Sequence, residues 1–363
     1  MLRRWLPLWT WLAPLVAWVL LGAFEAVPHP ALMAAIGVAL VACVLAAVHH
    51  AEVVAHRVGQ PLGGLVLALA VTVIEVALIV ALMLPDPAAT RTLARDTIFA
   101  EIMIILNGMV GLCLMLGGSR HGEQVFGRYG VSAALATLAT LSVMILILPN
   151  ATINSPGPAY APSQLAFVGV VTLVLYLVFV FVQTVRHRDY FVVGIGKVGE
   201  VDEAAPHGPR PSNRDAAIAS LLLLAALAAV VLSAHDLAPT IEAEIAAAGA
   251  PRATLGIIIG VLVLLPESLT ALKAALADRL QLSLNLALGS ALASIGLTIP
   301  TVAAFALAHG WTLSLGLDLK EEILLALSLL VATSSLGTGR TTVMQGAVHL
   351  VIFAVYLFTA IVP

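Results

Sequence analysis

Two glutamates lie deep inside long apolar stretches of this sequence, where an acidic side chain has few structural uses. Glu75 lies thirteen residues into the stretch 62–84, and Glu267 lies fourteen residues into the stretch 253–273. Stretches of this length span a bilayer, so both acids would lie near its middle, where an Asp costs about 2.5–3.5 kcal/mol on insertion scales. Either each acid is a neutral hydrogen-bonding group between helices, or the two together bind cations and protons.

The residues near the two acids supply space and oxygen atoms. Small residues precede each acid by eleven and seven positions: Gly64 and Ala68 before Glu75, Gly256 and Gly260 before Glu267. Such a stripe lets helices approach closely, and ordinary packing explains it as well as a binding site does. The following apolar stretch of the second half carries hydroxyls at steps of four, four and three: Ser290, Ser294, Thr298 and Thr301. In the first half, Asn107 lies 187 residues before Ser294.

A site rich in oxygen and poor in nitrogen suits hard cations such as Ca²⁺, Na⁺ or K⁺ better than Zn²⁺ or Cu²⁺. We therefore predict that cations and protons bind at Glu75, Glu267, Asn107, Ser294 and Ser290, with the two glutamates as the metal ligands. Weaker candidates would lie along the path to this site: Glu52, Glu242, Thr72 and Asn285. The first two would lie near opposite mouths of the path or at solvated helix ends.

Other ionisable residues have simpler interpretations. Glu101 follows Asp96 by five residues and would lie near the outer membrane interface. Three histidines surround Glu52: His49, His50 and His56. Their pattern, HHAEVVAH, is not the H-E-x-x-H motif of zinc hydrolases, so we interpret them as interfacial histidines, with pH sensing as an open role.

An internal repeat relates the two acids. Matched pairs are spaced by 190 to 192 residues: Glu52 and Glu242, Gly59 and Gly249, Gly64 and Gly256, Ala68 and Gly260, Glu75 and Glu267. Apolar sequence can match by chance, but matched acids make chance a poor explanation. The repeat favours a shared binding site over two unrelated packing contacts.

The elements that must position these residues are membrane helices. Hydrophobic residues make up 61% of the chain and charged residues 10%, whereas a soluble domain carries about 25% charged residues. We predict eleven spans, of which the tenth is the shortest: 5–24, 31–49, 62–84, 97–117, 130–149, 164–184, 216–234, 253–273, 284–307, 321–336 and 343–361. The first is too long for a typical signal peptide and lacks its cleavage pattern, so we expect it to be retained.

A polar segment, 187–214, divides the chain into an N-terminal helix (1–30), a first repeat of five spans (31–186) and a second of five (215–363). Two halves with an odd number of spans enter the membrane in opposite orientation, which predicts an inverted repeat. With a cytoplasmic N-terminus, 13 Lys and Arg residues lie inside and 4 outside, as the positive-inside rule requires. We therefore expect an inner-membrane protein with a cytoplasmic linker and a periplasmic C-terminus.

Several segments resemble the calcium–proton exchanger family of the cation antiporter superfamily, from about Val41 to the C-terminus. They are HHAEVVAHRVGQPLGGLVLALAVTVIEV, RDTIFAEIMIILNGMVGLCLMLGG, LLPESLTALKAAL, NLALGSALASIGLTIPTV and GTGRTTVMQGAVHLVIFAVYL. In this family the acids of the two repeats bind the cation, which the resemblance assigns to Glu75 and Glu267. Asn107 and Ser294 fall at the family's polar positions on the following helices.

The resemblance and the paired acids together predict an antiporter that exports Ca²⁺, with Na⁺ and K⁺ as alternatives, in exchange for protons. We expect no cofactor and no nucleic-acid partner, and homo-oligomers stay open. Two other classes are alternatives: a cation channel with an acidic ring, and an intramembrane metalloenzyme. A channel usually repeats by oligomerisation, and the enzyme would need a nucleophile–base pair or a metal motif that the sequence lacks.

Overall fold

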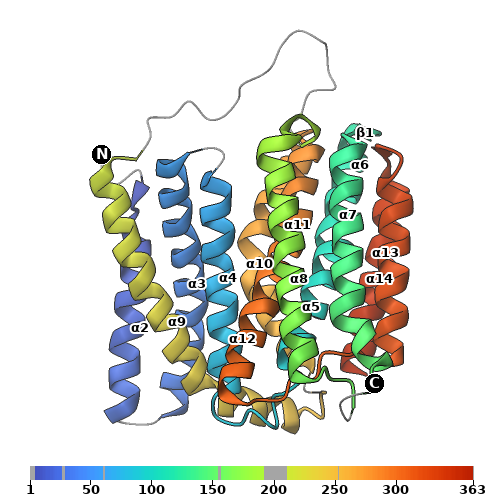
Figure 1. Ribbon diagram of the computed structural model, residues 1–363. Helices are drawn as coiled ribbons and strands as arrows, with labels where there is room; N and C mark the ends of the chain where they lie inside the picture. Colours follow the sequence, from blue (N-terminus) through green and yellow to red (C-terminus); the bar gives the residue numbers. More distant parts are fainter. Residues whose placement is uncertain are drawn as a thin grey trace. The chain divides into compact units, whose positions relative to one another are not determined.

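The structure, a computed structural model, describes residues 5–26, 29–59, 62–153, 157–191, 211–251 and 253–362, with the side chains of residues 25, 26, 62–65 and 188 outside the description. Helices dominate these ranges (Figure 1). The elements of the first half are α2 (Leu8–Ala26), α3 (Pro30–Val58), α4 (Leu62–Met83), α5 (Leu93–Met103), η1 (Ile104–Met109), α6 (Val110–His121), β1 (Gln124–Val125), α7 (Arg128–Ser142), η2 (Val143–Ile147), η3 (Leu148–Ala151), α8 (Pro162–Phe181), η4 (Val182–Arg186) and η5 (Arg188–Tyr190).

The second half repeats this order of helices. Its elements are α9 (Asn213–Ala247), α10 (Ala253–Leu276), α11 (Leu280–Ala293), η6 (Ser294–Thr298), α12 (Ile299–His309), α13 (Leu319–Leu336), β2 (Arg340–Thr341) and α14 (Val343–Ile361). Local sequence explains several helix starts, because side chain and backbone cap each other in the pairs Ser212 with Asp215, Asp318 with Glu321, and Thr342 with Gln345.

Nine helices within the described ranges are long and apolar enough to cross a membrane. Two more fall just short of that standard: α2, whose apolar part is Leu8–Phe24, and α13, whose first turn carries Lys320, Glu321 and Glu322. With these two, the helices correspond one for one to the eleven predicted spans when α5–η1–α6 and α11–η6–α12 are each counted as one interrupted helix. The chain is an all-α, multi-pass membrane protein.

Two helices extend well beyond the predicted spans. The first span of the second half was predicted over 216–234, but α9 has 35 residues, or about 50 Å at 1.5 Å per residue. A hydrocarbon core is only about 30 Å thick. Likewise α3 has 29 residues. Both helices continue from their apolar part into a polar part, because helical hydrogen bonding does not stop where hydropathy falls.

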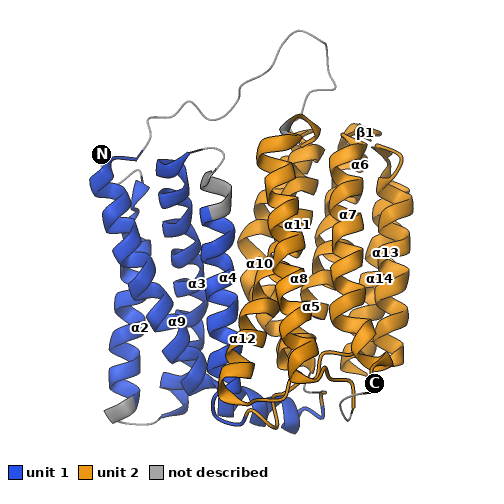
Figure 2. Ribbon diagram, viewed as in Figure 1, with its two compact units in different colours: residues 1–86, 204–249 blue, residues 87–203, 250–363 orange. Residues whose placement is uncertain are grey.

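The chain forms two compact units (Figure 2). Unit 1 comprises residues 1–86 and 204–249, and unit 2 comprises residues 87–203 and 250–363. Each half of the sequence therefore contributes to both units. The repeat boundaries predicted from the sequence describe a different division, and they stay a prediction.

In unit 1, α3 and α9 pack against each other in opposite directions. Arg57 near the end of α3 donates hydrogen bonds from its guanidinium to Oδ1 of Asn213, the first residue of α9. The shorter α2 lies against both helices, and Trp18 donates from Nε1 to the carbonyl oxygen of Ala225 at 3.2 Å. Glu52 and Glu242, each on the last turns of its helix, therefore lie toward opposite ends of this unit.

Unit 2 is built from reciprocal contacts between the two repeats. The turn after α6 forms β1, which pairs in antiparallel fashion with β2, from the turn after α13. The turn after α12 makes the corresponding contacts with the turn after α7, where Leu317 N donates to Leu146 O and Gly316 N to Pro158 O. Each repeat's third-to-fourth connection thus binds the other repeat's fourth-to-fifth connection. This exchange is the pattern expected of an inverted pseudo-twofold repeat.

The third helix of each repeat is interrupted by a π-helical segment at the same place. η1 begins at Ile104 and η6 begins at Ser294, 190 residues later, which is a spacing of the sequence repeat. Gly108 in η1 lies against the ring of Phe353, and Gly296 in η6 lies against Tyr176. A methyl group at Gly296 would collide with Tyr176 at 2.7 Å, and one at Gly108 would lie tightly against Phe353 at 3.2 Å, so the glycines let α8 and α14 approach the two segments. π-Helical turns occur often at functional sites.

Candidate cation-binding site

Glu75 and Glu267, the two predicted metal ligands, belong to different units. Glu75 lies on α4 of unit 1 and is fully buried at 0% exposure. Glu267 lies on α10 of unit 2 and is half-buried. The shared cavity predicted from the sequence stays a prediction. The surroundings of each acid within its own unit are described below.

The small face of α10, which carries Glu267, packs against α5. A methyl group on Gly256 would lie 2.7 Å from the carbonyl carbon of Asp96, and one on Gly260 would lie 3.2 Å from Cγ of Glu101. The predicted close approach is therefore present for these two glycines, and its partner within unit 2 is α5. Of the matching pair on α4, Ala68 is half-buried, and the surroundings of Gly64 lie outside the described residues.

These two contacts set the register between α10 and the interrupted helix α5–η1–α6. Asp96 lies opposite Gly256 and Glu101 lies opposite Gly260, so the two helices run in parallel. Glu267 is seven residues beyond Gly260, or about 10 Å along the axis. Residues about seven positions beyond Glu101 belong to η1, and α10 packs on η1. Glu267 therefore lies at about the level of Asn107.

Asn107 is fully buried in η1 and anchors a hydrogen-bond network. Its Nδ2 donates to Oγ of Ser328 on α13 at 2.8 Å, and its Oδ1 lies 3.2 Å from Nδ1 of His349 on α14. Nε2 of His349 lies 2.9 Å from Oγ of Ser335. All four side chains are buried. The network joins η1, in the first repeat, to α13 and α14, the last two helices of the second repeat.

The atom that donates in each of these hydrogen bonds follows from the groups that can play only one role. The Ser328 hydroxyl donates to the carbonyl oxygen of Leu324 at 2.7 Å, so its oxygen accepts from Asn107 Nδ2. Asn107 Oδ1 can only accept, which makes Nδ1 of His349 a donor. In a neutral His349 the free lone pair is then on Nε2, which accepts from Ser335.

Sequence reasoning identified Asn107 but not its partners, Ser328, Ser335 and His349. The signal for His349 was present, because it is the one ionisable residue other than Tyr356 in the apolar stretch 343–361. The partners of Asn107 were not readable from the sequence because His349 is 242 residues away.

The predicted hydroxyl row of the second repeat is divided by η6. Ser294 is 5% exposed and begins the π-helical segment, and Thr298 at its end is fully buried. Ser290, one turn earlier on α11, is half-buried, and Thr301 is exposed and donates to the carbonyl oxygen of Leu297 at 2.7 Å. A straight helix would have kept these residues on one face, but the wider π turn moves Thr301 off it. Since η6 packs on α5 and η1 packs on α11, Ser294 and Asn107 lie on contacting helices.

Asn285 has a structural role at the start of α11. Its Nδ2 donates to the carbonyl oxygen of Phe191 at 2.5 Å, and its Oδ1 accepts from Nε2 of Gln281 at 2.9 Å. Gly130 leaves room for the carbonyl oxygen of Tyr190, which would lie 2.5 Å from a methyl group there. These contacts hold the first residues of the polar segment 187–214 against unit 2.

The remaining path candidates lie in unit 1. Thr72, one turn before Glu75, is buried and donates to the carbonyl oxygen of Ala68 at 2.9 Å. Glu52 and Glu242 are half-buried. The histidines near Glu52 contact the beginning of the chain: Nε2 of His49 lies 2.9 Å from Trp5 O, and Nε2 of His50 lies 3.1 Å from Thr10 O. They hold α2 against α3.

Glu101 is fully buried between helices, which the sequence did not indicate. It was expected near an interface because Asp96 is only five residues away. Every residue of α5 is buried, so nearness to the helix start does not expose this side chain.

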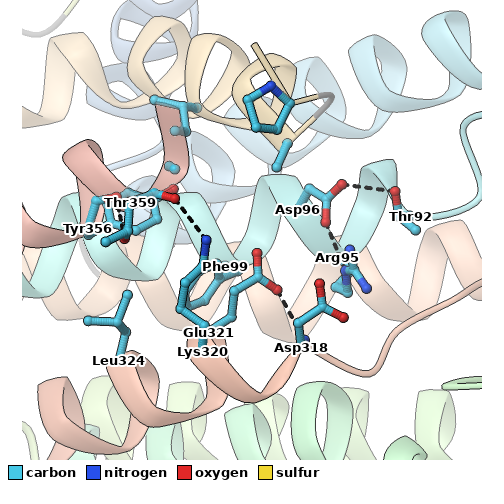
Figure 3. A pocket seen from close by; sticks show the side chains of 14 residues that line it. Thr92, Arg95, Asp96, Phe99, Asp318, Lys320, Glu321, Leu324, Tyr356 and Thr359 are labelled. Carbon is cyan, nitrogen blue, oxygen red and sulfur yellow. Dashed lines mark hydrogen bonds and ion pairs between the residues drawn. The ribbon is translucent and has the colours of Figure 1, made fainter. Parts of the chain in front are cut away.

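A charged cavity of about 250 Å³ lies at the end of unit 2 where α5, α10 and α13 begin and α14 ends (Figure 3). Arg95 Nε donates to Asp96 Oδ1 at 2.8 Å, and Nη1 donates to the carbonyl oxygen of Gly316 at 2.8 Å. Lys320 donates to Thr359 O at 2.8 Å. The other acids in the lining are Asp318 and Glu321. Two cationic side chains among three acids make this cavity a poor site for a further cation.

A protein family and several known proteins are similar to this chain. The family model described as "Sodium/calcium exchanger protein" matches residues 28–185 and 218–362. A protein of Sinorhizobium fredii named as an ionic transporter, y4hA, is 49% identical over 98% of this chain and 97% of its own length. The sodium-potassium/proton antiporter ChaA of Escherichia coli is 37% identical over 90% of this chain and 87% of its own length.

Solved structures agree with the fold. The structure of native YfkE has a TM-score of 0.73 at 16% identity and covers 98% of this chain and 99% of that one. The family model covers far more than half of the chain, in two segments that fall on either side of the central linker. Its members are transporters of inorganic cations and not enzymes. The chain belongs to the sodium/calcium exchanger family.

Proposed function

We propose that this protein exchanges Ca²⁺ for protons across the membrane, by alternating access around a site to which Glu75 and Glu267 both contribute. The observation that carries the proposal is the position of Glu267, a half-buried acid at about the level of Asn107 in an interrupted helix. Glu75, fully buried on the helix that matches α10 in the repeat, is the natural second ligand.

Charge balance explains why such a site would exchange its ligands. Two buried, ionised carboxylates near each other are very unfavourable, because burial and mutual repulsion both oppose their charge. One Ca²⁺ or two protons make the pair neutral. Either neutral form can pass through an occluded state, whereas the empty, doubly charged form cannot. Protons and cation therefore compete, and a proton gradient drives cation export.

Three polar side chains of unit 2 would complete the proposed site. Ca²⁺ commonly takes six to eight oxygen ligands in all. Uncharged oxygen ligands would be added to the two carboxylates by Asn107, Ser294 and Ser290. Thr72, Asn285, Glu52 and Glu242 would line the path. Among the described residues no three His, Cys, Asp or Glu side chains are grouped to hold a metal ion, so amide and hydroxyl oxygens would have to contribute.

The names of the relatives support both monovalent and divalent cations as substrates. ChaA is named as a sodium-potassium/proton antiporter, and YfkE is described as a Ca²⁺/H⁺ antiporter. Na⁺ and K⁺ are therefore alternative substrates. With the excess of basic residues on one side, we place the N-terminus and the 187–214 linker in the cytoplasm and the C-terminus in the periplasm of the inner membrane.

Purified protein in liposomes tests this proposal. With an acidic lumen and a pH-sensitive dye inside, addition of Ca²⁺, Na⁺ or K⁺ outside should raise the internal pH only for a transported cation. In an exchanger, cation uptake should stop when the lumen holds no excess of protons, and proton release should stop when no transported cation is present outside. Cation uptake that continues without proton movement would contradict antiport and favour the channel alternative.

A further inference from the structure

The charged cavity of unit 2 extends from solvent toward the middle of the membrane (Figure 3). Its volume of about 250 Å³ is far more than the roughly 10–15 Å³ that one water molecule requires. Two exposed side chains, Asp318 and Lys320, lie at its mouth. The lining residues deepest along α5, α13 and α14 are Phe99, Leu324 and Tyr356, and all three are buried. The cavity therefore ends in a closed wall that is mainly apolar.

Beyond this wall, two helices lead directly to the Asn107 network. On α5 the face that carries Phe99 continues one turn later at Met103 and another turn later at Asn107 in η1. On α13 Leu324 is four residues from Ser328, or about 6 Å along the axis. Sδ of Met103 lies 3.7 Å from Asn107 Nδ2 and 3.4 Å from Ser328 Oγ. A layer of side chains about one helical turn thick thus separates the cavity from the network.

Two aromatic rings form the part of this layer that faces the cavity. The rings of Phe99 and Tyr356 meet edge to face, with their centroids 5.5 Å apart and their planes at 87°. They come from different helices, α5 and α14, and from different repeats. Rotation of a side chain needs no change in the backbone. The layer can therefore open to water by a movement of these two rings without any helix unfolding.

The charged groups of the lining suit protons better than a metal cation. They come from α5 and from the start of α13: Arg95, Asp96, Asp318, Lys320 and Glu321. The Lys320 ammonium is held by the Thr359 carbonyl, and Arg95 by Asp96 and Gly316, so both positive charges stay in the wall. Ca²⁺ takes six to eight oxygen ligands together and would be repelled by these charges. A proton passes between neighbouring water molecules and needs no such set of ligands.

We propose that this cavity is the outer vestibule of a water route into the middle of unit 2, and that protons use this route while the metal cation does not. The inference rests on the proposed function, in which protons must reach the level of Asn107 and Glu267 from both sides of the membrane. Phe99 and Tyr356 close the route in this conformation, and their separation connects the vestibule to the Asn107 network by water. The proposed topology puts the vestibule on the periplasmic side, from which protons enter during cation export.

Filling the vestibule through an introduced cysteine tests this route. Ala360 lies half-buried in the wall and has no side-chain hydrogen bond to lose, so Ala360→Cys is a mild change. Membrane vesicles are loaded with Ca²⁺, and an impermeant thiol reagent with a bulky head is added on the C-terminal side. Modification should slow proton-driven release of Ca²⁺ several-fold. Exchange of internal Ca²⁺ for external labelled Ca²⁺, which needs no proton, should keep its rate.

The controls are Thr312→Cys, an exposed position at the same end but outside the lining, and the unmutated chain, whose Cys43 and Cys113 are buried. Neither should respond to the reagent. Unchanged proton-driven release after complete modification of Ala360→Cys would overturn the inference, and so would an equal loss of both reactions. A wild-type chain that performs neither reaction would instead refute the proposed function.

The variant Phe99→Ala tests the ring pair. With Ser328→Cys as a reporter beyond the rings, it should raise the rate at which a small impermeant thiol reagent modifies the reporter several-fold. The matched control is Phe179→Ala, because Phe179 meets the ring of Phe191 edge to face at 5.9 Å, at the opposite end of unit 2. Equal reporter rates in the two folded variants would show that Phe99 does not close the route.

Discussion

At the scale of single residues, the polar groups of unit 2 differ in how their burial is compensated. The side-chain amide of Asn107 forms hydrogen bonds through both its nitrogen and its oxygen. The guanidinium of Arg95 donates hydrogen bonds to Asp96 and to the carbonyl oxygen of Gly316. Such complete networks hold helices in one arrangement, because any loss leaves a buried polar group unpaired. For Glu267 we propose a different role, because a carboxylate at the membrane centre can exchange a proton for a cation.

Glu267→Gln should reduce cation–proton exchange to background while the protein still inserts. The amide has nearly the same shape as the carboxylic acid, but it cannot ionise, so the site can neither attract a cation nor release a proton. Exchange in proteoliposomes measures this. The matched control is Glu123→Gln, because the Glu123 side chain is 48% exposed and forms its ion pair with Arg340 at the surface. Normal exchange by Glu267→Gln at equal protein amount would show that this acid is structural.

Arg95→Ala should lower the free energy of unfolding by about 3–5 kcal/mol, the cost of breaking a buried ion pair. The side chains of Arg95 and Asp96 are only 10% and 5% exposed, so removal of the guanidinium leaves the buried Asp96 carboxylate without its counter-ion, with only the hydrogen bond from Thr92, and the Gly316 carbonyl without the guanidinium donor. Arg340→Ala is the control, since its side chain is 72% exposed and such pairs contribute under about 1 kcal/mol. Equal thermal stability of the two variants in detergent would contradict the prediction.

At the scale of elements, glycines and π-helical segments decide which helices approach one another. Gly256 and Gly260 bring α5 onto α10, and Gly108 and Gly111 bring α14 onto the interrupted helix that carries Asn107. The π-helical segments then change the direction of the following side chains. Together they determine that Asn107 lies toward α13 and α14, at about the depth of Glu267.

Gly256→Ala should destabilise the α5–α10 contact. The new methyl carbon would lie 2.7 Å from the backbone of Asp96, which has no flexible side-chain end to move aside, so overpacking should cost about 1–3 kcal/mol. Gly22→Ala in α2 meets nothing within 4 Å and should be neutral or stabilising, because Ala favours helices over Gly. Melting temperature in detergent compares the two. A Gly256→Ala protein that is as stable as Gly22→Ala would mean that the helices are not in close contact.

At the scale of the whole molecule, the two repeats of the chain are combined within both units. In unit 2 the connection between the third and fourth helices of each repeat contacts the other repeat, at β1 with β2 and at Leu317 with Leu146. In unit 1 the first helices of both repeats, α3 and α9, lie against each other. Each compact unit therefore combines helices from both halves of the chain.

The topology makes a prediction about the chain ends. From eleven spans and the distribution of Lys and Arg, we predict that the N-terminus is cytoplasmic and the C-terminus periplasmic. A phosphatase that is active only in the periplasm should therefore work when fused after Pro363, and a fluorescent protein that matures only in the cytoplasm should fluoresce when inserted into the linker. The reverse pattern would require a different number of spans or the opposite orientation.

The central linker should be dispensable for exchange. Deleting residues 203–208 removes part of the polar segment but leaves untouched both the Phe191 contact with Asn285 and the cap of α9 at Ser212. We expect normal exchange in liposomes, with any change limited to its dependence on cytoplasmic cation. The deletion is compared with Asn285→Ala, which removes the hydrogen bond that anchors the start of the segment at Phe191. Failure of the deletion variant at every pH and cation concentration would place the linker in the transport machinery.

The sequence alone determined the class of this protein and its eleven helices, and it predicted the repeat and the role of the two acids. These features are local, because about 20 apolar residues must form a membrane helix and a mid-span acid is costly wherever the helix packs. Only the tertiary structure decided that α5 occupies the small face of α10 and that Asn107 bonds His349, 242 residues away. Hydropathy cannot reveal such contacts, because an apolar side chain has the same hydropathy whether it faces lipid or another helix. Helix partners are instead chosen by small-residue fit and buried hydrogen bonds between distant segments.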